Sequence, residues 1–197
     1  MSNTKLSAAL AVVILFCTGA ARAAPVLDQQ AAPFGGSLYE GFEWQQQVTS
    51  GLSGLLSGLT LYGAGTNVTV RVNAGDGFYS GPYAFSQTVQ LASGGTFVDT
   101  SAANIQLAAG QRFVIDLING GGGNISTAAA PYAGGHLYLN LGAPSDFTAC
   151  CNMTLAFQTL VDAPAAVPEP ASWALMLVGF GGAGALLRRG RGAALAA

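Results

Sequence analysis

Short segments in which apolar and polar residues alternate dominate the middle of the chain. Val68, Val70 and Val72 alternate with Thr69 and Arg71, so one side of this segment is apolar and the other is polar. A period of two is that of a half-buried β-strand, because successive side chains of a strand point to opposite faces. The same alternation recurs at residues 112–117, with apolar Phe113, Ile115 and Leu117, and at residues 136–141, with apolar Leu137, Leu139 and Leu141.

Further strands are expected along the same region, separated by turns rich in glycine and asparagine. No segment there carries a sustained apolar stripe at helical spacing. Roughly eight short strands with such turns predict an all-β fold, an antiparallel, jelly-roll-like β-sandwich over residues 24–166. The additional strands are expected at residues 38–44, 55–62, 85–91, 104–107 and 153–161, and the turns at 73–77, 93–95, 109–110 and 119–123.

Residues 1–23 are typical of a secretory signal peptide with a helical apolar core. Lys5 supplies the positive charge, residues 6–16 are apolar, and Ala21 and Ala23 place small side chains where a signal peptidase inspects the chain. The apolar run is shorter than the roughly 20 residues that span a bilayer. We expect cleavage by signal peptidase before Ala24; a retained N-terminal anchor is the alternative.

A second apolar run lies near the C-terminus, between a proline-rich approach and a basic cluster. Residues 173–187 would form about 22 Å of helix, which is short against a hydrocarbon core of about 30 Å. The positive-inside rule would keep the following arginines, Arg188, Arg189 and Arg191, in the cytoplasm. The pattern predicts a short transmembrane helix.

The order of Pro168, Glu169 and Pro170, a short glycine-rich apolar helix and an arginine cluster resembles the PEP-CTERM sorting signal of Gram-negative bacteria. The resemblance covers residues 167–191 and implies that an exosortase, a membrane transpeptidase-like enzyme, recognises the Pro-Glu-Pro motif and processes the tail. An ordinary C-terminal anchor with a chance Pro-Glu-Pro is the alternative. Residues 192–197 form a tail.

The body between these signals is also similar, more weakly, to sandwich-type ectodomains of PEP-CTERM proteins. The similarity lies at residues 46–62, 131–138 and 154–159, and it implies architecture and surface placement but no reaction. The chain would then be exported, passing through the inner membrane to the cell surface or the extracellular space.

Charge narrows the range of partners. Charged residues make up 8% of the chain, against about 25% in an average soluble domain. Most basic residues lie in the two terminal segments, so the body has two basic and eight acidic residues and a formal charge of −6. An acidic exported domain would repel nucleic acid, and we expect no nucleic-acid partner.

The residue inventory offers little for catalysis or metal binding. His136 is the only histidine, so every Ser-His-Asp or Cys-His arrangement would have to use it, and its place beside Gly134 and Gly135 is typical of a solvent-facing residue. One histidine and two mature cysteines do not make the usual zinc site. Asp76 in the turn at 73–77 lacks the partner carboxylates of a calcium loop. We expect no catalytic residue, no metal site and no cofactor.

Two adjacent cysteines, Cys150 and Cys151, remain after the signal peptide with Cys17 is removed. Their Cα atoms would lie about 3.8 Å apart, below the usual range for a disulfide. In an oxidising compartment the pair could close a local ring, link two chains, or stay as free thiols. All three remain open at the level of sequence.

Four aromatic residues surround Gly81 and Pro82, namely Phe78, Tyr79, Tyr83 and Phe85. Exposed aromatic rings stack on sugars, so these residues are candidate glycan contacts, with Trp44 as a further candidate. The alternative is that they fill the edge of the sandwich.

Three functions follow from these observations. The first is a non-enzymatic cell-surface or extracellular-matrix protein, delivered by its sorting signal to an envelope that makes exopolysaccharide. The second is a carbohydrate-binding module for that exopolysaccharide. The third and weakest is a polysaccharide hydrolase, which needs two facing carboxylates. The candidate carboxylates for such a hydrolase are Asp76, Asp99, Asp116 and Asp146.

Overall fold

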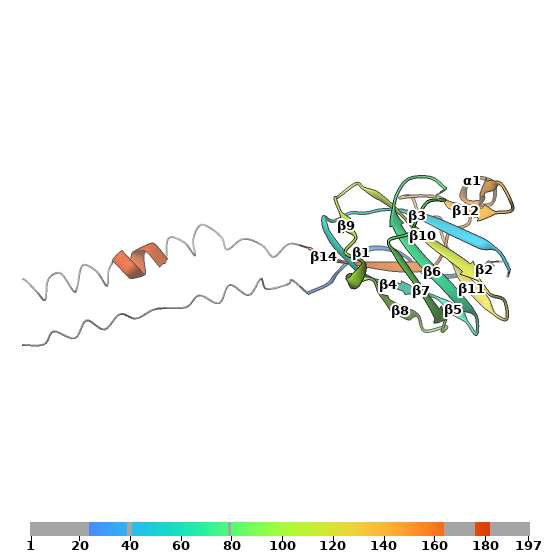
Figure 1. Ribbon diagram of the computed structural model, residues 1–197, viewed down its shortest axis with the longest axis horizontal. Helices are drawn as coiled ribbons and strands as arrows, with labels where there is room; N and C mark the ends of the chain where they lie inside the picture. The colour runs from blue at the N-terminus through green and yellow to red at the C-terminus, as the bar shows by residue number, and fades with distance from the viewer. Residues whose placement is uncertain (1–23, 39–40, 79, 164–175, 182–197) are drawn as a thin grey trace, which may run out of the picture.

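The computed structural model describes residues 24–38, 41–78, 80–163 and 176–181 and contains three antiparallel sheets (Figure 1). The largest has the strand order β13-β12-β3-β10-β6-β7. A second has the order β1-β14-β4-β8, with β9 also paired to β4, and a small third sheet has the order β2-β11-β5. Successive strands cross between sheets, as from β3 to β4 and from β4, through the short β5, to β6. The chain is therefore an antiparallel β-sandwich, as the alternating segments predicted.

The strands of the three sheets have these bounds. The large sheet contains β3 (Glu43–Thr49), β6 (Asn67–Ala74), β7 (Phe85–Gln90), β10 (Arg112–Asn119), β12 (Leu137–Asn140) and β13 (Pro144–Asp146). The second contains β1 (Val26–Ala31), β4 (Gly54–Leu61), β8 (Thr96–Asp99), β9 (Gln106–Leu107) and β14 (Phe157–Asp162). The third contains β2 (Pro33–Leu38), β5 (Gly63–Ala64) and β11 (Asn124–Ala128), and two short helices are η1 (Ser101–Ala103) and α1 (Phe147–Cys151).

One hydrophobic core joins the sheets. The apolar positions of the alternating segments point into it, and the large sheet contributes Trp44 and Phe113 while the second contributes Leu59 and Phe157. Ile125 of β11 packs into the same cluster, which ties the third sheet to the sandwich. The sequence pattern therefore identified the inward faces of β6, β10 and β12 correctly.

Several boundaries differ from the prediction. The strand expected at residues 38–44 is two strands, β2 and β3, which belong to different sheets. The last strand begins at Phe157 rather than at residue 153, and Leu141 lies beyond the end of β12 with 59% of its surface exposed. Five strands, β1, β5, β8, β11 and β13, and the single-turn helix α1 had no prediction. They are short or mixed in polarity, and periodicity needs several repeats before it indicates an element.

The terminal segments lie largely outside the described residues. This holds for the signal peptide at 1–23, for Pro168, Glu169 and Pro170, and for the arginine cluster. Residues 176–181 are helical and their apolar side chains are exposed. Among the residues that the structure describes, no helix combines the length and the hydropathy needed to cross a bilayer.

The contact between β12 and β3 leaves no room for a side chain at Gly135. This residue is buried, and a Cβ placed on it would collide with the backbone carbonyl of Gln47. The neighbouring residue, His136, accepts a hydrogen bond from the Gln47 amide at 2.8 Å, which fixes the start of the pairing.

We expect Gly135→Ala to lower the free energy of unfolding by about 2 kcal/mol, because overpacking against backbone cannot be relieved by rotating a side chain. Gly94→Ala is the matched control, since nothing lies within 4 Å of its Cβ position. Urea unfolding of both variants measures the difference. Equal stability of the two variants would contradict the prediction.

Candidate functional site

The face of the large sheet that points away from the core carries polar side chains that are buried nonetheless. Gln45 of β3 pairs with Asp116 of β10, and Asp116 pairs with Arg71 of β6, so the three lie in one row across the sheet. Asp116 and Gln45 have no exposed surface. Something therefore covers this outer face of the sheet.

The cover is the segment between β6 and β7. Its Tyr83 hydroxyl accepts a hydrogen bond from Gln45 Nε2 at 3.1 Å, and its Asp76 Oδ1 accepts one from Gln47 Nε2 at 2.6 Å. The ring of Phe78 meets that of Tyr138 edge to face, with centroids 6.4 Å apart. These contacts hold Asp76, Phe78 and Tyr83 against strands β3 and β12.

Arg71 is the centre of the polar cluster, by which we mean Glu43, Gln45, Arg71, Tyr83 and Asp116. Its guanidinium donates to Asp116 and, at 2.5 Å, to Glu43 Oε1. The guanidinium carbon also lies 4.3 Å from the centroid of the Tyr83 ring, a cation–π distance. One cation thus joins two carboxylates and an aromatic ring from three different parts of the chain.

The rim of the polar cluster remains open to solvent. Arg71 and Glu43 each keep 24% of their side-chain surface exposed. Asn140 of β12 donates to the second oxygen of Glu43 at 2.7 Å, which fixes the carboxylate plane. A ligand on this face would meet an oriented carboxylate, an amide and a guanidinium beside aromatic rings.

Burial changes the acidity of the groups in the polar cluster. Burial raises the pKa of Asp116 to about 7, and the nearby Glu43 acts in the same direction while Arg71 opposes it. Burial, followed by the charge of Asp116, raises the pKa of Tyr83 above its ordinary value. Asp116 therefore titrates near neutral pH, unlike an ordinary carboxyl group.

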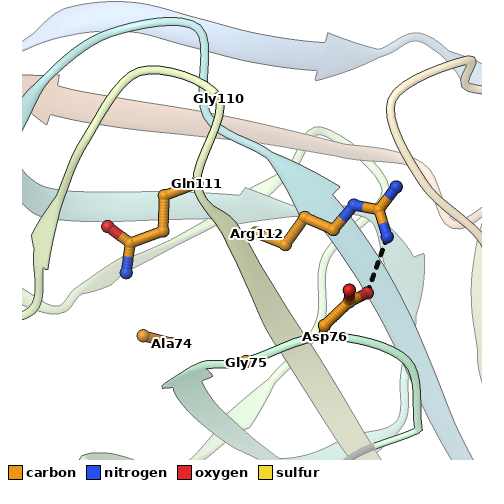
Figure 2. A pocket seen from close by; sticks show the side chains of 6 residues that line it. All are labelled: Ala74, Gly75, Asp76, Gly110, Gln111 and Arg112. Carbon is orange, nitrogen blue, oxygen red and sulfur yellow. Dashed lines mark hydrogen bonds and ion pairs between the residues drawn. The ribbon is translucent and has the colours of Figure 1, made fainter.

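A separate hollow lies at the end of β6 and the start of β10. It has a volume of about 560 Å³ and is lined by Ala74, Gly75, Asp76, Gly110, Gln111 and Arg112 (Figure 2). Arg112 Nη1 lies 2.7 Å from Asp76 Oδ1, and this hydrogen bond lowers the pKa of Asp76. Both side chains are well exposed, so the pair contributes little to stability.

The predicted glycan contacts separate into two groups. Phe78 and Tyr83 lie on the outer face of the large sheet, as a contact with a sugar requires. Trp44 is fully buried beside Phe147, so its interpretation as a sugar contact was wrong. Phe85 is half-buried and packs against the hydrophobic core, in agreement with the alternative that it fills the edge of the sandwich. The alternation of β6 explains why the Phe85 side chain points inward, because Phe85 pairs with Val72, whose side chain is in the core. Tyr79 lies outside the described residues.

The acids considered for hydrolysis have different partners. Asp76 pairs with Arg112, and Asp99 accepts from the Ser101 amide at the start of η1. Asp146 caps α1 through the Ala149 amide and lies 2.8 Å from His136 Nδ1. Asp116 lies near Glu43, an acid that was absent from the predicted set.

The two cysteines form a disulfide at the end of α1. Phe147 at the start of this single turn packs edge to face on Trp44, with ring centroids 5.1 Å apart. Thr148 accepts a hydrogen bond from the Leu137 amide at 2.7 Å and ties the turn to β12. Of the three arrangements left open by the sequence, the structure contains the local ring.

Sequence reasoning missed Glu43, Gln45 and Arg71 as site residues. One signal was available in the run of Gln45, Gln46 and Gln47, which follows the strand expected at residues 38–44 and belongs to β3. Consecutive polar residues on a strand place polar groups on both faces, and buried polar groups must find partners.

Comparison with known proteins identifies the C-terminal segment. Residues 166–191 match the family model of the PEP-CTERM protein-sorting motif. The chain carries a PEP-CTERM sorting motif. The resemblance drawn from the sequence is thereby confirmed, and the PEP-CTERM motif implies an exported protein that is processed at the membrane with an exosortase as partner. No curated protein and no solved structure matches the chain.

The buried carboxyl of Asp116 makes stability depend on pH in a direction that can be tested. Its pKa is about 7 in the folded chain and about 3.9 in an unfolded one, so ionisation favours unfolding. The contribution of the protonated Asp116 carboxyl to the free energy of unfolding is complete below pH 4 and is lost as the pH rises to 7.

Asp116→Asn should remove this contribution. Between pH 4 and 8 the free energy of unfolding of the unsubstituted chain should fall, relative to the variant, by up to about 4 kcal/mol. Asp99→Asn is the control, because the pKa of Asp99 is lowered and its effect is confined to acid pH. Parallel curves for the unsubstituted chain and Asp116→Asn would contradict the assignment.

Proposed function

We propose that the chain is a non-enzymatic protein of the cell surface or extracellular matrix, presented outside the cell by PEP-CTERM sorting. The observation that carries the proposal is the PEP-CTERM motif at residues 166–191, directly after a sandwich whose last strand ends at Asp162. In this arrangement the signal peptide starts export, and the exosortase acts on the tail once the sandwich has crossed the inner membrane.

The composition of the body supports the proposal. Its acidic charge suits an extracellular domain, because copies of like charge repel each other. The disulfide at α1 suits an oxidising compartment.

Replacement of Pro168, Glu169 and Pro170 by alanine should leave the sandwich folded and prevent processing of the tail. We expect the variant to accumulate in the membrane fraction with an intact C-terminus, whereas the unsubstituted chain loses it. Intact mass measured on membrane and supernatant fractions distinguishes the two. Alanine replacement of Arg112, which lies in the body, is the control. Unchanged fractionation and mass would refute the proposed sorting.

A second function, carbohydrate binding, is favoured by the outer face of the large sheet. Phe78 and Tyr138 offer aromatic surface beside the oriented side chains of Glu43, Arg71 and Asn140. Sugar sites combine stacking on an aromatic ring with planar polar groups that bind neighbouring hydroxyls. We propose exopolysaccharide as the ligand of this face.

Tyr138→Ala should weaken binding of purified exopolysaccharide by about fivefold to tenfold, because the variant loses one stacking surface. Isothermal titration calorimetry measures the affinity. Phe97→Ala is the control, since Phe97 is 57% exposed on β8 of the second sheet, away from this face. Absence of saturable binding, or an equal loss in both variants, would refute the second function and leave the sorting function standing.

A further inference from the structure

The edges of the two large sheets differ in how they are protected. A strand at a sheet edge presents unpaired backbone N–H and C=O groups, and natural edges are guarded by charges, prolines, bulges or short length. Here the large sheet ends at β13 and β7, and the second sheet ends at β1 and at β8 with β9.

Three of these four edges have at least one of these protective features. Strand β1 has a register shift between Leu27 and Gln29, where Asp28 turns to accept hydrogen bonds from the 51–52 backbone. Strand β13 has three residues, begins at Pro144 and ends at Asp146. Strand β8 has four residues, ends at Asp99 and is separated from β9 by η1.

The edge at β7 has no charge, proline or bulge, and it is not short. The strand has six residues of sequence FSQTVQ, without a charge, a proline or a glycine. It pairs with β6 over all six positions without a register shift, so it contains no β-bulge. Ser86, Gln87, Thr88 and Gln90 are exposed, and no strand among the described residues pairs with its outer side. At the end of the strand the Gln90 carbonyl accepts a hydrogen bond from the Thr96 hydroxyl at 3.1 Å, so the unpaired part of the edge is centred on Ser86 to Thr88.

We propose that β7 is a strand-addition surface whose partner is β7 of a second copy of this chain. Two identical strands pair antiparallel about a two-fold axis, which makes a closed dimer. Centred on Thr88, this pairing sets Thr88 opposite its counterpart and Ser86 opposite Gln90. No two charges oppose each other along the strand.

The sheet itself favours a second copy over an unrelated peptide. The hydroxyl of Thr88 lies 2.9 Å from that of Thr69 on β6, so threonines already pair across neighbouring strands on this face. A second Thr88 continues that ladder, and Thr–Thr pairs stabilise antiparallel sheets. A copy also brings its own twisted sheet, so two six-stranded sheets join into one. This inference goes beyond the proposed sorting and carbohydrate binding.

The first experiment measures oligomeric state with the full chain purified in a mild detergent. Sedimentation velocity over about a hundredfold range of concentration should show a monomer–dimer equilibrium. Thr88→Lys sets two lysines opposite each other and should weaken the dimer by at least about tenfold. Gln30→Lys on the guarded edge β1 is the matched control and should leave the equilibrium unchanged. Thermal unfolding shows that both variants are folded.

The second experiment traps the pairing directly. A cysteine at position 88, introduced as Thr88→Cys, should form a disulfide-linked dimer on mild oxidation, whereas Gln30→Cys should not. A monomer throughout the concentration range would overturn the proposal. Equal weakening by the two lysine variants, or equal cross-linking of the two cysteine variants, would overturn it as well, because either result assigns association to another surface.

Discussion

The structure of the outer face of the large sheet depends on the contacts of the buried Asp116 side chain. A carboxylate without exposed surface is costly unless a cation and hydrogen-bond donors accompany it. Arg71, on the neighbouring strand, offsets part of this cost by donating to Asp116, although burial still raises the pKa of Asp116 to about 7; Arg71 also extends to Glu43 and to the ring of Tyr83. Because Tyr83 belongs to the segment between β6 and β7, the same arginine holds that segment on the sheet. The buried acid and the cover therefore depend on each other.

This arrangement gives the sandwich two different outer faces. The face of the second sheet leaves Phe97 exposed, whereas the face of the large sheet is covered at its centre and polar at its rim. Glu43 and Asn140 at that rim are fixed by contacts inside the protein before any ligand arrives. Preorganised groups lose little entropy on binding, and this supports the proposal that this face binds a ligand.

The sequence predicted the inward faces of the main strands well and the polar cluster poorly, for one physical reason. Alternation at residues 68–72 and 113–117 shows which face of a strand is apolar, and that face must be buried. It does not show whether the polar face is covered as well. The partners of Arg71 lie 28 and 45 residues away, so only the strand order β3-β10-β6 brings them together. Helix α1 is a single turn and has no period to detect.

The distribution of charge on residues 24–166 affects where two copies of the chain can come into contact. The body carries a formal charge of −6, and like-charged copies repel each other at long range. At physiological ionic strength this repulsion is screened beyond about 8 Å, while paired strands lie about 4.8 Å apart. Close contact is therefore favourable only where the touching segments are neutral and present backbone groups to pair. Strand β7 meets both conditions, and the acids on the other edges exclude them from such contact. The same charges that keep the exported chain soluble thus direct its copies to meet at one edge.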